Sequence, residues 1–136
     1  MDFFSAMEVS ASGLSAQRTR MTVASSNLAN ASTTRTAAGG PYQRRDVVLA
    51  SVPMNNATAG VSGVAVQQIV ADPTPPRLEY DPGHPDADVD GYVAYPNVNP
   101  VEEMVDMITA SRAYEAGVTA LSTSVSMAES ALRIGR

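Results

Sequence analysis

The nine prolines of this 136-residue chain all lie between residues 41 and 100. Proline removes a backbone donor and clashes with the preceding turn, so it breaks helix interiors. Long helices are therefore permitted only in the two proline-free ends, residues 1–34 and 101–136. The middle also holds six of the nine glycines and is typical of strands and turns. The sequence predicts a mainly α protein with a small β and loop insertion.

The second proline-free end opens with a helix start signal. Asn99 is a good N-cap residue, and Pro100 fits the first helical position. Apolar side chains then recur at alternating steps of three and four, which is the spacing of a coiled-coil seam. This seam comprises Met104, Met107, Ser111, Tyr114, Val118, Leu121, Val125, Ala128 and Leu132. A second stripe through Val101, Val105 and Ile108 is expected to widen the apolar face in the first turns.

The first end shows the same period more weakly. Its seam comprises Phe4, Met7, Ala11, Leu14, Arg18, Met21, Ser25 and Leu28. Asp2 is one candidate N-cap, and Ser5 with Glu8 is a second. We expect the two end helices to pair as a coiled coil, so that residues 1–34 and 101–136 form one discontinuous helical domain. Residues 35–100 would form a second, β- and loop-rich segment.

The first helix is unusually poor in charge. Residues 1–34 hold four charged side chains, whereas 17 of the 34 residues are Ala, Ser or Thr. A helix with one face in water normally carries charge on that face. We therefore expect protein to surround this helix on several sides, with other copies or partners supplying cover that one chain cannot easily provide.

The middle segment contains four candidate strands, at 42–49, 61–70, 77–80 and 92–95. Residues 51–60 are expected to form a flexible connection. The cluster Arg44-Arg45-Asp46 is most simply an exposed, partly self-compensating group of charges. Whether this segment forms a compact sheet or an extended arm is left open by the pattern.

Several function classes are disfavoured by composition. The chain has no cysteine and no lysine, so thiol chemistry and a lysine-containing phosphate loop are excluded. Its net charge of −5 argues against a dedicated nucleic-acid binder. No cleaved secretory leader and no apolar run long enough to span a membrane is apparent.

Two chemical motifs compete with a purely structural interpretation. Asp86, Asp88 and Asp90 with Gly91 match the first half of a calcium loop. The twelfth position is Asn97 rather than glutamate, so an acidic surface turn is the simpler interpretation. His84, the only histidine, could serve a hydrolase beside these acids, although it lies in a turn with no nucleophile motif.

Three stretches resemble a known family. Ser26–Thr34 reads SNLANASTT, residues 40–48 read GPYQRRDVV, and residues 81–116 run from DPGHPDAD through GYV and YPNVNPVEEMVDMI to SRAYEA. Together they resemble the bacterial flagellar basal-body rod proteins, closest to those of the proximal rod, over nearly the whole chain. The residues that carry this family signature include Asn27, Asn30, Pro41, Tyr42, Gly91, Tyr92, Pro96, Asn99 and Pro100.

The resemblance implies a non-enzymatic subunit with no catalytic residue, cofactor or metal. It implies export without a cleaved leader and helical polymerisation into a hollow rod that crosses the periplasm. The terminal helices would line the export channel, and the middle segment would pack outside them. The implied partners are copies of itself, the proximal-rod subunits FlgB and FlgF, the rod–ring adaptor FliE and the distal-rod protein FlgG.

The same resemblance makes the two apolar seams an assembly interface as well as an internal contact. The side chains expected to form that interface are Phe4, Met7, Leu14, Met21, Leu28, Met104, Met107, Tyr114, Val118, Leu121, Val125 and Leu132.

Overall fold

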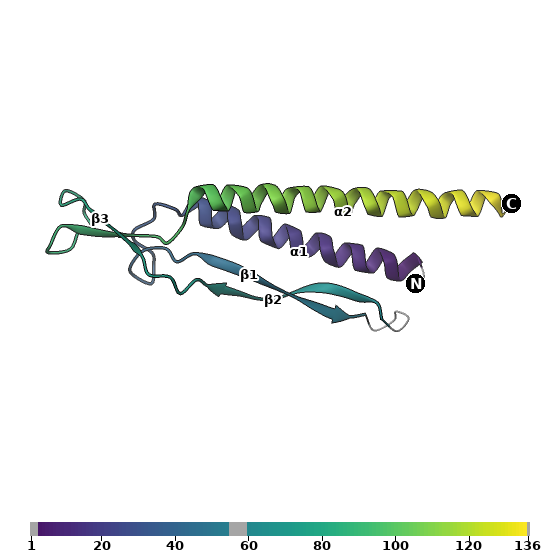
Figure 1. The fold of residues 1–136 in the computed structure, drawn as a ribbon, viewed down its shortest axis with the longest axis horizontal. Coiled ribbons are helices and arrows are strands. Elements are labelled where there is room, and N and C mark those ends of the chain that lie inside the picture. Colours follow the sequence, from purple (N-terminus) through teal and green to yellow (C-terminus); the bar gives the residue numbers. More distant parts are fainter. Residues whose placement is uncertain (1–2, 55–59, 136) are drawn as a thin grey trace.

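The computed structural model describes residues 3–54 and 60–135 (Figure 1). Two long helices enclose four strands in the order of the chain. The elements are α1 (Phe3–Ala29), β1 (Arg45–Pro53), β2 (Ser62–Ala71), β3 (Arg77–Tyr80), β4 (Tyr92–Tyr95) and α2 (Pro100–Ile134). The predicted class, two end helices around a small β insertion, is confirmed.

The molecule is elongated and is built from side-by-side rods (Figure 1). α1 lies between α2 and the β1–β2 hairpin, and it packs against both. α1 begins and α2 ends at the same end of the molecule, where α2 extends beyond its shorter neighbour. The β3–β4 hairpin projects from the opposite end. The middle segment is thus an extended arm of two hairpins.

Local signals place the helix ends. The side chain of Asn99 accepts a hydrogen bond from the Val101 amide at 3.1 Å, and Pro100 is the first residue of α2, as predicted. Ser5 lies inside α1, so the proposed cap at Ser5 with Glu8 is wrong, because the helix already begins at Phe3. The alternative cap, Asp2, lies outside the described residues.

The strands form two separate antiparallel pairs, β1 with β2 and β3 with β4. The two short strands lie where they are predicted. β1 begins at Arg45 rather than at residue 42, because the Tyr42 amide bonds the Thr33 carbonyl and the Arg44 amide bonds the Asn97 side chain. It continues to Pro53, opposite Ser62, so residues 51–53 are strand rather than the predicted connection. Residues 55–59 of that connection lie outside the described residues.

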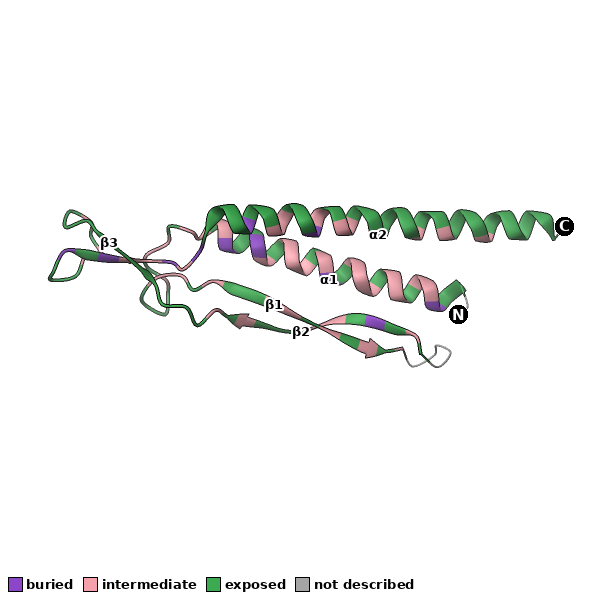
Figure 2. Cartoon of the chain, viewed as in Figure 1, coloured by how far each residue is buried: buried purple, intermediate pink, exposed green. Residues whose placement is uncertain are grey.

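The single chain has a small core (Figure 2). Within residues 3–54 and 60–135, the buried apolar side chains are Ala16, Ala24, Val93, Pro96, Val98 and Ala110. α1 is covered on two sides by α2 and by the β1–β2 hairpin. The chain itself therefore supplies much of the cover that the charge-poor composition of α1 led us to expect from other copies. No helix in the described part of the chain is long and apolar enough to cross a membrane.

The covered face of α2 differs from the predicted seam. Among the described elements α1 alone packs against α2, and the α2 positions that are not exposed are Glu103, Asp106, Met107, Ala110, Ser111, Ala113, Tyr114, Gly117, Leu121, Ser124 and Ala128. Five of the nine predicted seam positions belong to this set, namely Met107, Ser111, Tyr114, Leu121 and Ala128. Met104, Val118, Val125 and Leu132 are exposed, and so is the Val101, Val105 and Ile108 stripe. On α1, Met7, Leu14, Met21 and Leu28 are partly covered, while Phe4 is exposed.

A substitution at Gly91 tests the β3–β4 hairpin, which we call the outer hairpin. Its φ is +84°, and a Cβ built there would lie 2.8 Å from the Tyr80 ring. Gly91→Ala should therefore destabilise the β3–β4 hairpin by about 1–2 kcal/mol, measured by urea unfolding with tyrosine fluorescence. Gly83→Ala is the matched control, since its Cβ would make an ordinary 3.6 Å contact and its φ is not positive. Equal losses in both variants would contradict this account.

Candidate functional site

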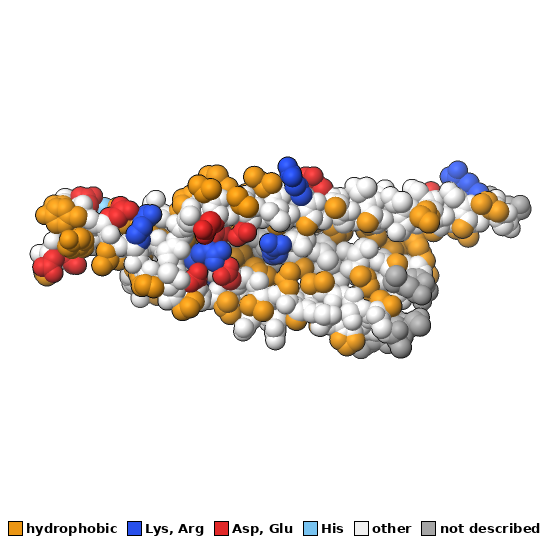
Figure 3. Space-filling model, in the orientation of Figure 1, with side chains coloured by type: hydrophobic (Ala, Val, Ile, Leu, Met, Phe, Trp, Pro, Cys, Tyr) orange, Lys and Arg blue, Asp and Glu red, His pale blue; other side chains and the backbone are white. Residues whose placement is uncertain are grey.

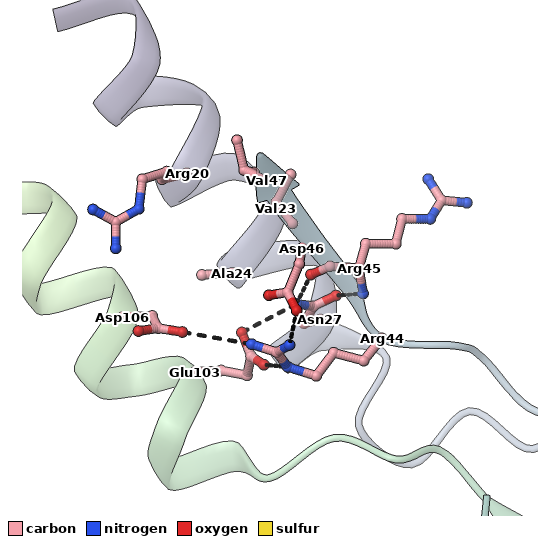
Figure 4. Close-up of a pocket in the computed structure, with 10 residues that line it drawn as sticks. All are labelled: Arg20, Val23, Ala24, Asn27, Arg44, Arg45, Asp46, Val47, Glu103 and Asp106. Carbon is pink, nitrogen blue, oxygen red and sulfur yellow. Dashed lines mark hydrogen bonds and ion pairs between the residues drawn. The ribbon is translucent and has the colours of Figure 1, made fainter. Parts of the chain in front are cut away.

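The end of α1, the start of β1, the end of β2 and the start of α2 meet at a polar junction, which we define as Asn27, Tyr42, Arg44, Asp46, Asp72, Glu103 and Asp106. Figure 4 shows five of these residues, Asn27, Arg44, Asp46, Glu103 and Asp106. Four chain segments distant in sequence thus supply one cluster, because Asp72 comes from the end of β2. Several of these side chains line a pocket of about 250 Å³, together with Arg20, Val23, Ala24, Arg45 and Val47.

Asn27 is the organising amide of the junction and is only 1% exposed. Its Nδ2 donates to the Arg45 carbonyl at 2.9 Å and to Glu103 Oε2 at 3.1 Å. Its Oδ1 accepts from the Tyr42 hydroxyl at 2.9 Å and from the Arg45 amide at 3.1 Å. An amide side chain can make four hydrogen bonds, and all four are present. Asn27 therefore fixes the first residue of β1 onto α1.

Arg44 supplies the positive charge of the junction. Its Nε bonds Glu103, and its other nitrogens lie 2.7 Å from Asp46, 3.5 Å from Asp72 and 3.6 Å from Asp106. Burial alone would lower the pKa of Arg44, but hydrogen bonds and charge attraction from Glu103 and Asp46 outweigh it and raise the pKa above its ordinary value. The guanidinium is thus a permanent cation among four carboxylates.

Glu103 is the most deeply buried acid of the junction, at 1% exposed. A buried carboxylate is costly unless it is paired and hydrogen-bonded. Glu103 meets both conditions through Arg44 and Asn27. The expectation that Arg44-Arg45-Asp46 is an exposed cluster is wrong for Arg44, whose side chain is 15% exposed, because these partners lie far away in sequence. Arg45 does point away into solvent (Figure 4).

The residues of the family signature fall into three structural groups. Asn27 and Tyr42 belong to the junction, while Asn30 closes the end of α1 by donating to the Ser26 carbonyl and accepting from Thr33. Gly91 and Tyr92 shape the outer hairpin, where the Tyr80 and Tyr92 rings meet edge to face at 5.4 Å. Pro96 is buried, and Asn99 and Pro100 begin α2. Pro41 lies in the turn before β1.

Sequence reasoning missed Arg44 and Glu103 as central residues. No local signal distinguished them, because Glu103 stands beside Glu102 in the acidic start of the second helix and off its predicted apolar face.

The acidic turn at Asp86–Asp90 has structural partners. Asp86 accepts a hydrogen bond from the Thr34 hydroxyl at 2.8 Å and pairs with Arg35. Asp88 Oδ1 accepts from the Asp90 and Tyr92 amides, each at 2.9 Å. In the ranges that the structure describes, no group of three His, Asp or Glu side chains could hold a metal ion. No observation supports the calcium alternative.

His84 has a role within the same turn. Its Nδ1 accepts a hydrogen bond from the Asp86 amide at 3.0 Å, and its ring lies edge to face with Tyr95. These contacts stabilise the turn, and they place no nucleophile beside the imidazole as the hydrolase hypothesis requires.

The Thr34–Asp86 hydrogen bond links the segment after α1 to the outer hairpin, and we expect its contribution to stability to be lost in acid. The Thr34 hydrogen bond, assisted by Arg35, holds the pKa of Asp86 below its ordinary value of 3.8. A carboxyl with a depressed folded-state pKa stabilises the fold fully above the unfolded pKa, and that contribution is lost as pH falls through the folded pKa. In the parent chain, the free energy of unfolding should therefore fall as the pH is lowered from about 5 to 2. In Thr34→Val this fall should be smaller, as measured by urea unfolding at each pH. Thr36→Val, whose hydroxyl bonds a carbonyl instead, should leave the slope unchanged.

The fold and the junction define a class of protein. It is an elongated assembly subunit, in which the charge-poor α1 packs between α2 and the β1–β2 hairpin and large apolar side chains are left exposed along α2.

Known proteins identify the particular family. Residues 7–35 match the family model described as flagella basal body rod protein, and residues 89–134 match flagellar basal body rod FlgEFG protein C-terminal. The chain is 48% identical to the flagellar basal-body rod protein FlgC of Borreliella burgdorferi, covering 98% of each chain. It is 43% identical to that of Bacillus subtilis and 40% identical to that of Escherichia coli, covering all of each chain. The chain therefore belongs to the FlgC family of flagellar basal-body rod proteins.

Proposed function

We propose that this chain is a structural subunit of the proximal rod of the bacterial flagellar basal body. It polymerises helically with other rod proteins into a hollow drive shaft that transmits torque and surrounds the export channel. The observation that carries this function is the unpartnered apolar surface of α2. The large apolar side chains exposed on this helix are Val101, Met104, Val105, Ile108, Val118, Val125, Met127, Leu132 and Ile134.

This surface is too extensive for a helix that works alone in water. Figure 3 shows hydrophobic side chains gathered over the start of α2, away from α1. Large contiguous apolar patches mark interaction surfaces in soluble proteins. Each Val or Ile side chain taken out of water contributes about 1.5–3 kcal/mol, so a few such contacts can drive association.

α1 offers a face of different shape. Its exposed positions recur at steps of three and four and are mostly small, including Ala11, Ser15, Thr22, Ser25 and Ala29. Small side chains permit close approach by a bulkier helix. We propose that the exposed apolar side chains of α2, which we call the α2 stripe, pack in one subunit on the small-residue face of α1 in the next. A contact between two different faces is heterologous, and it builds an open helical assembly when the rotation between subunits does not close a ring.

The order of the layers in the subunit supports a radial arrangement within the rod. The helix pair of residues 1–34 and 101–136 would be the inner domain at the channel, and residues 35–100 would lie outside it. The rod would cross the periplasm, with FlgB, FlgF and FliE as neighbours and FlgG beyond. Its role would be mechanical rather than catalytic, with export through the flagellar secretion apparatus.

Gene deletion and complementation test this function. Deleting the gene from the bacterium that encodes it should abolish swimming and rod formation, and a plasmid copy should restore both. Mass spectrometry of purified basal bodies should then detect the chain. Normal swimming after deletion, or a restored strain whose basal bodies lack the chain, would contradict the proposal.

A further inference from the structure

The contact face between the two helices repeats every seven residues over most of its length, so its apolar packing alone discriminates weakly between registers one heptad apart. On α1 one partly covered set, spaced seven residues apart, is large, namely Met7, Leu14, Met21 and Leu28. On α2 one covered set is small, Ala110, Gly117 and Ser124, and the other set begins with the large Met107, Tyr114 and Leu121. Sliding one helix by a heptad, about 10 Å, would place similar side chains opposite one another at most positions. The exception is Leu14, which would meet Ala110 or Ser124 in place of Gly117, where an added Cβ would lie 2.8 Å from Leu14 Cδ2.

One covered position of α2 breaks this repetition. Glu103 occupies the same heptad position as Ala110, Gly117 and Ser124, but it is a buried carboxylate. Its partners Asn27 and Arg44 are held together, because Asn27 bonds both backbone groups of Arg45. A one-heptad slip would leave Glu103 without these partners and would set small, apolar Ala110 or an exposed position in its place.

We propose that the Asn27–Arg44–Glu103 cluster sets the register of α1 against α2. A buried polar group at one core position selects register in paired helices, because only one alignment satisfies its hydrogen bonds. The register decides how far α2 extends beyond α1, and hence which apolar side chains a subunit presents. This assignment concerns the folded chain itself and does not depend on the proposed function.

The chain is suited to a disulfide test because it has no cysteine of its own. A Cβ at Gly117 would lie 2.8 Å from Leu14 Cδ2, so Leu14→Cys with Gly117→Cys reports the native register. Leu14→Cys with Ser124→Cys reports a slip of one heptad. In the native register that second pair is about 10 Å further along the helix, beyond the reach of a disulfide. Dilute, mildly oxidised protein is then assayed for intramolecular disulfides by peptide mass spectrometry.

Glu103→Ala is the decisive variant, since it makes position 103 resemble the other small positions. In the chain that carries Leu14→Cys and Ser124→Cys, adding Glu103→Ala should raise the disulfide yield about tenfold over the same cysteine pair with Glu103 intact. The reason is that hydrogen bonds to a charged group no longer favour one register over the other. Glu103→Gln keeps an oxygen that can accept from Asn27 and should retain the native pattern. Glu102→Ala, on an exposed neighbouring acid, should also retain it.

The proposal is overturned if Glu103→Ala keeps its helical circular dichroism and still crosslinks only the 14/117 pair. Loss of helix in both reporter backgrounds would also overturn it, because Glu103 would then be needed for stability rather than alignment. A 14/124 disulfide in the Glu102→Ala control would show that slippage does not depend on the cluster.

Discussion

Ile108→Asp should abolish incorporation into the rod and stop swimming while leaving the isolated subunit folded. Ile108 is 56% exposed in the single chain, so a carboxylate there remains in water before assembly. In an assembled rod the same carboxylate would be buried against apolar neighbours without a partner. That costs several kcal/mol per contact, which corresponds to a loss of at least about 100-fold in association. Motility assays and basal-body composition would measure the effect, with circular dichroism to check the fold.

Ile108→Leu is the matched control, since it keeps an apolar side chain of the same volume and should support swimming. Val125→Asp and Leu121→Asp should also block incorporation, although the partly covered Leu121 would lose fold stability as well. Normal rods from Ile108→Asp would remove the α2 stripe from the assembly interface.

Arg44→Met should lower the free energy of unfolding by about 3–5 kcal/mol. The change leaves Glu103 buried without its cation, and it also leaves Asp46, Asp72 and Asp106 without their shared partner. Because domains are stable by only about 5–15 kcal/mol, such a loss takes a large share of the total. Urea unfolding followed by circular dichroism would measure it.

Arg45→Met provides the matched control. It removes the same charge one residue away, from an exposed side chain that points into solvent (Figure 4). Its effect should stay within about 0.5 kcal/mol. The double variant Arg44→Met/Glu103→Leu should recover most of the loss, because replacing both members of a buried ion pair is often nearly neutral. Equal losses for Arg44→Met and Arg45→Met would show that the junction does not stabilise the fold.

The helices could be predicted because their determinants are local. The exclusion of proline from the ends and the cap at Asn99 act within a few residues of the chain. Strand bounds were less accurate at β1, where residues 42–44 form turn and side-chain bonds to partners as distant as Asn97. No local pattern encodes such a partner.

The contact face of α2 shows the same limit. The hydrophobicity of the side chains predicts that Met104 is buried and Glu103 is exposed, and the structure shows the reverse. Asn27 and Arg44 offset the free-energy cost of burying Glu103, and both residues lie in other segments of the chain. Further along, Gly117 rather than Val118 lies under Leu14, because only a residue without a side chain permits so close an approach.

The amino-acid sequence by itself determined the two end helices, the β character of the middle, and the family, since these depend on local backbone preferences and contiguous motifs. Tertiary structure alone decided which side of α2 meets α1, how the hairpin covers α1, and that Arg44 and Glu103 form the centre of the junction. These features depend on which distant groups satisfy one another's charges and hydrogen bonds, and such pairing is settled only when the folded chain brings them into contact.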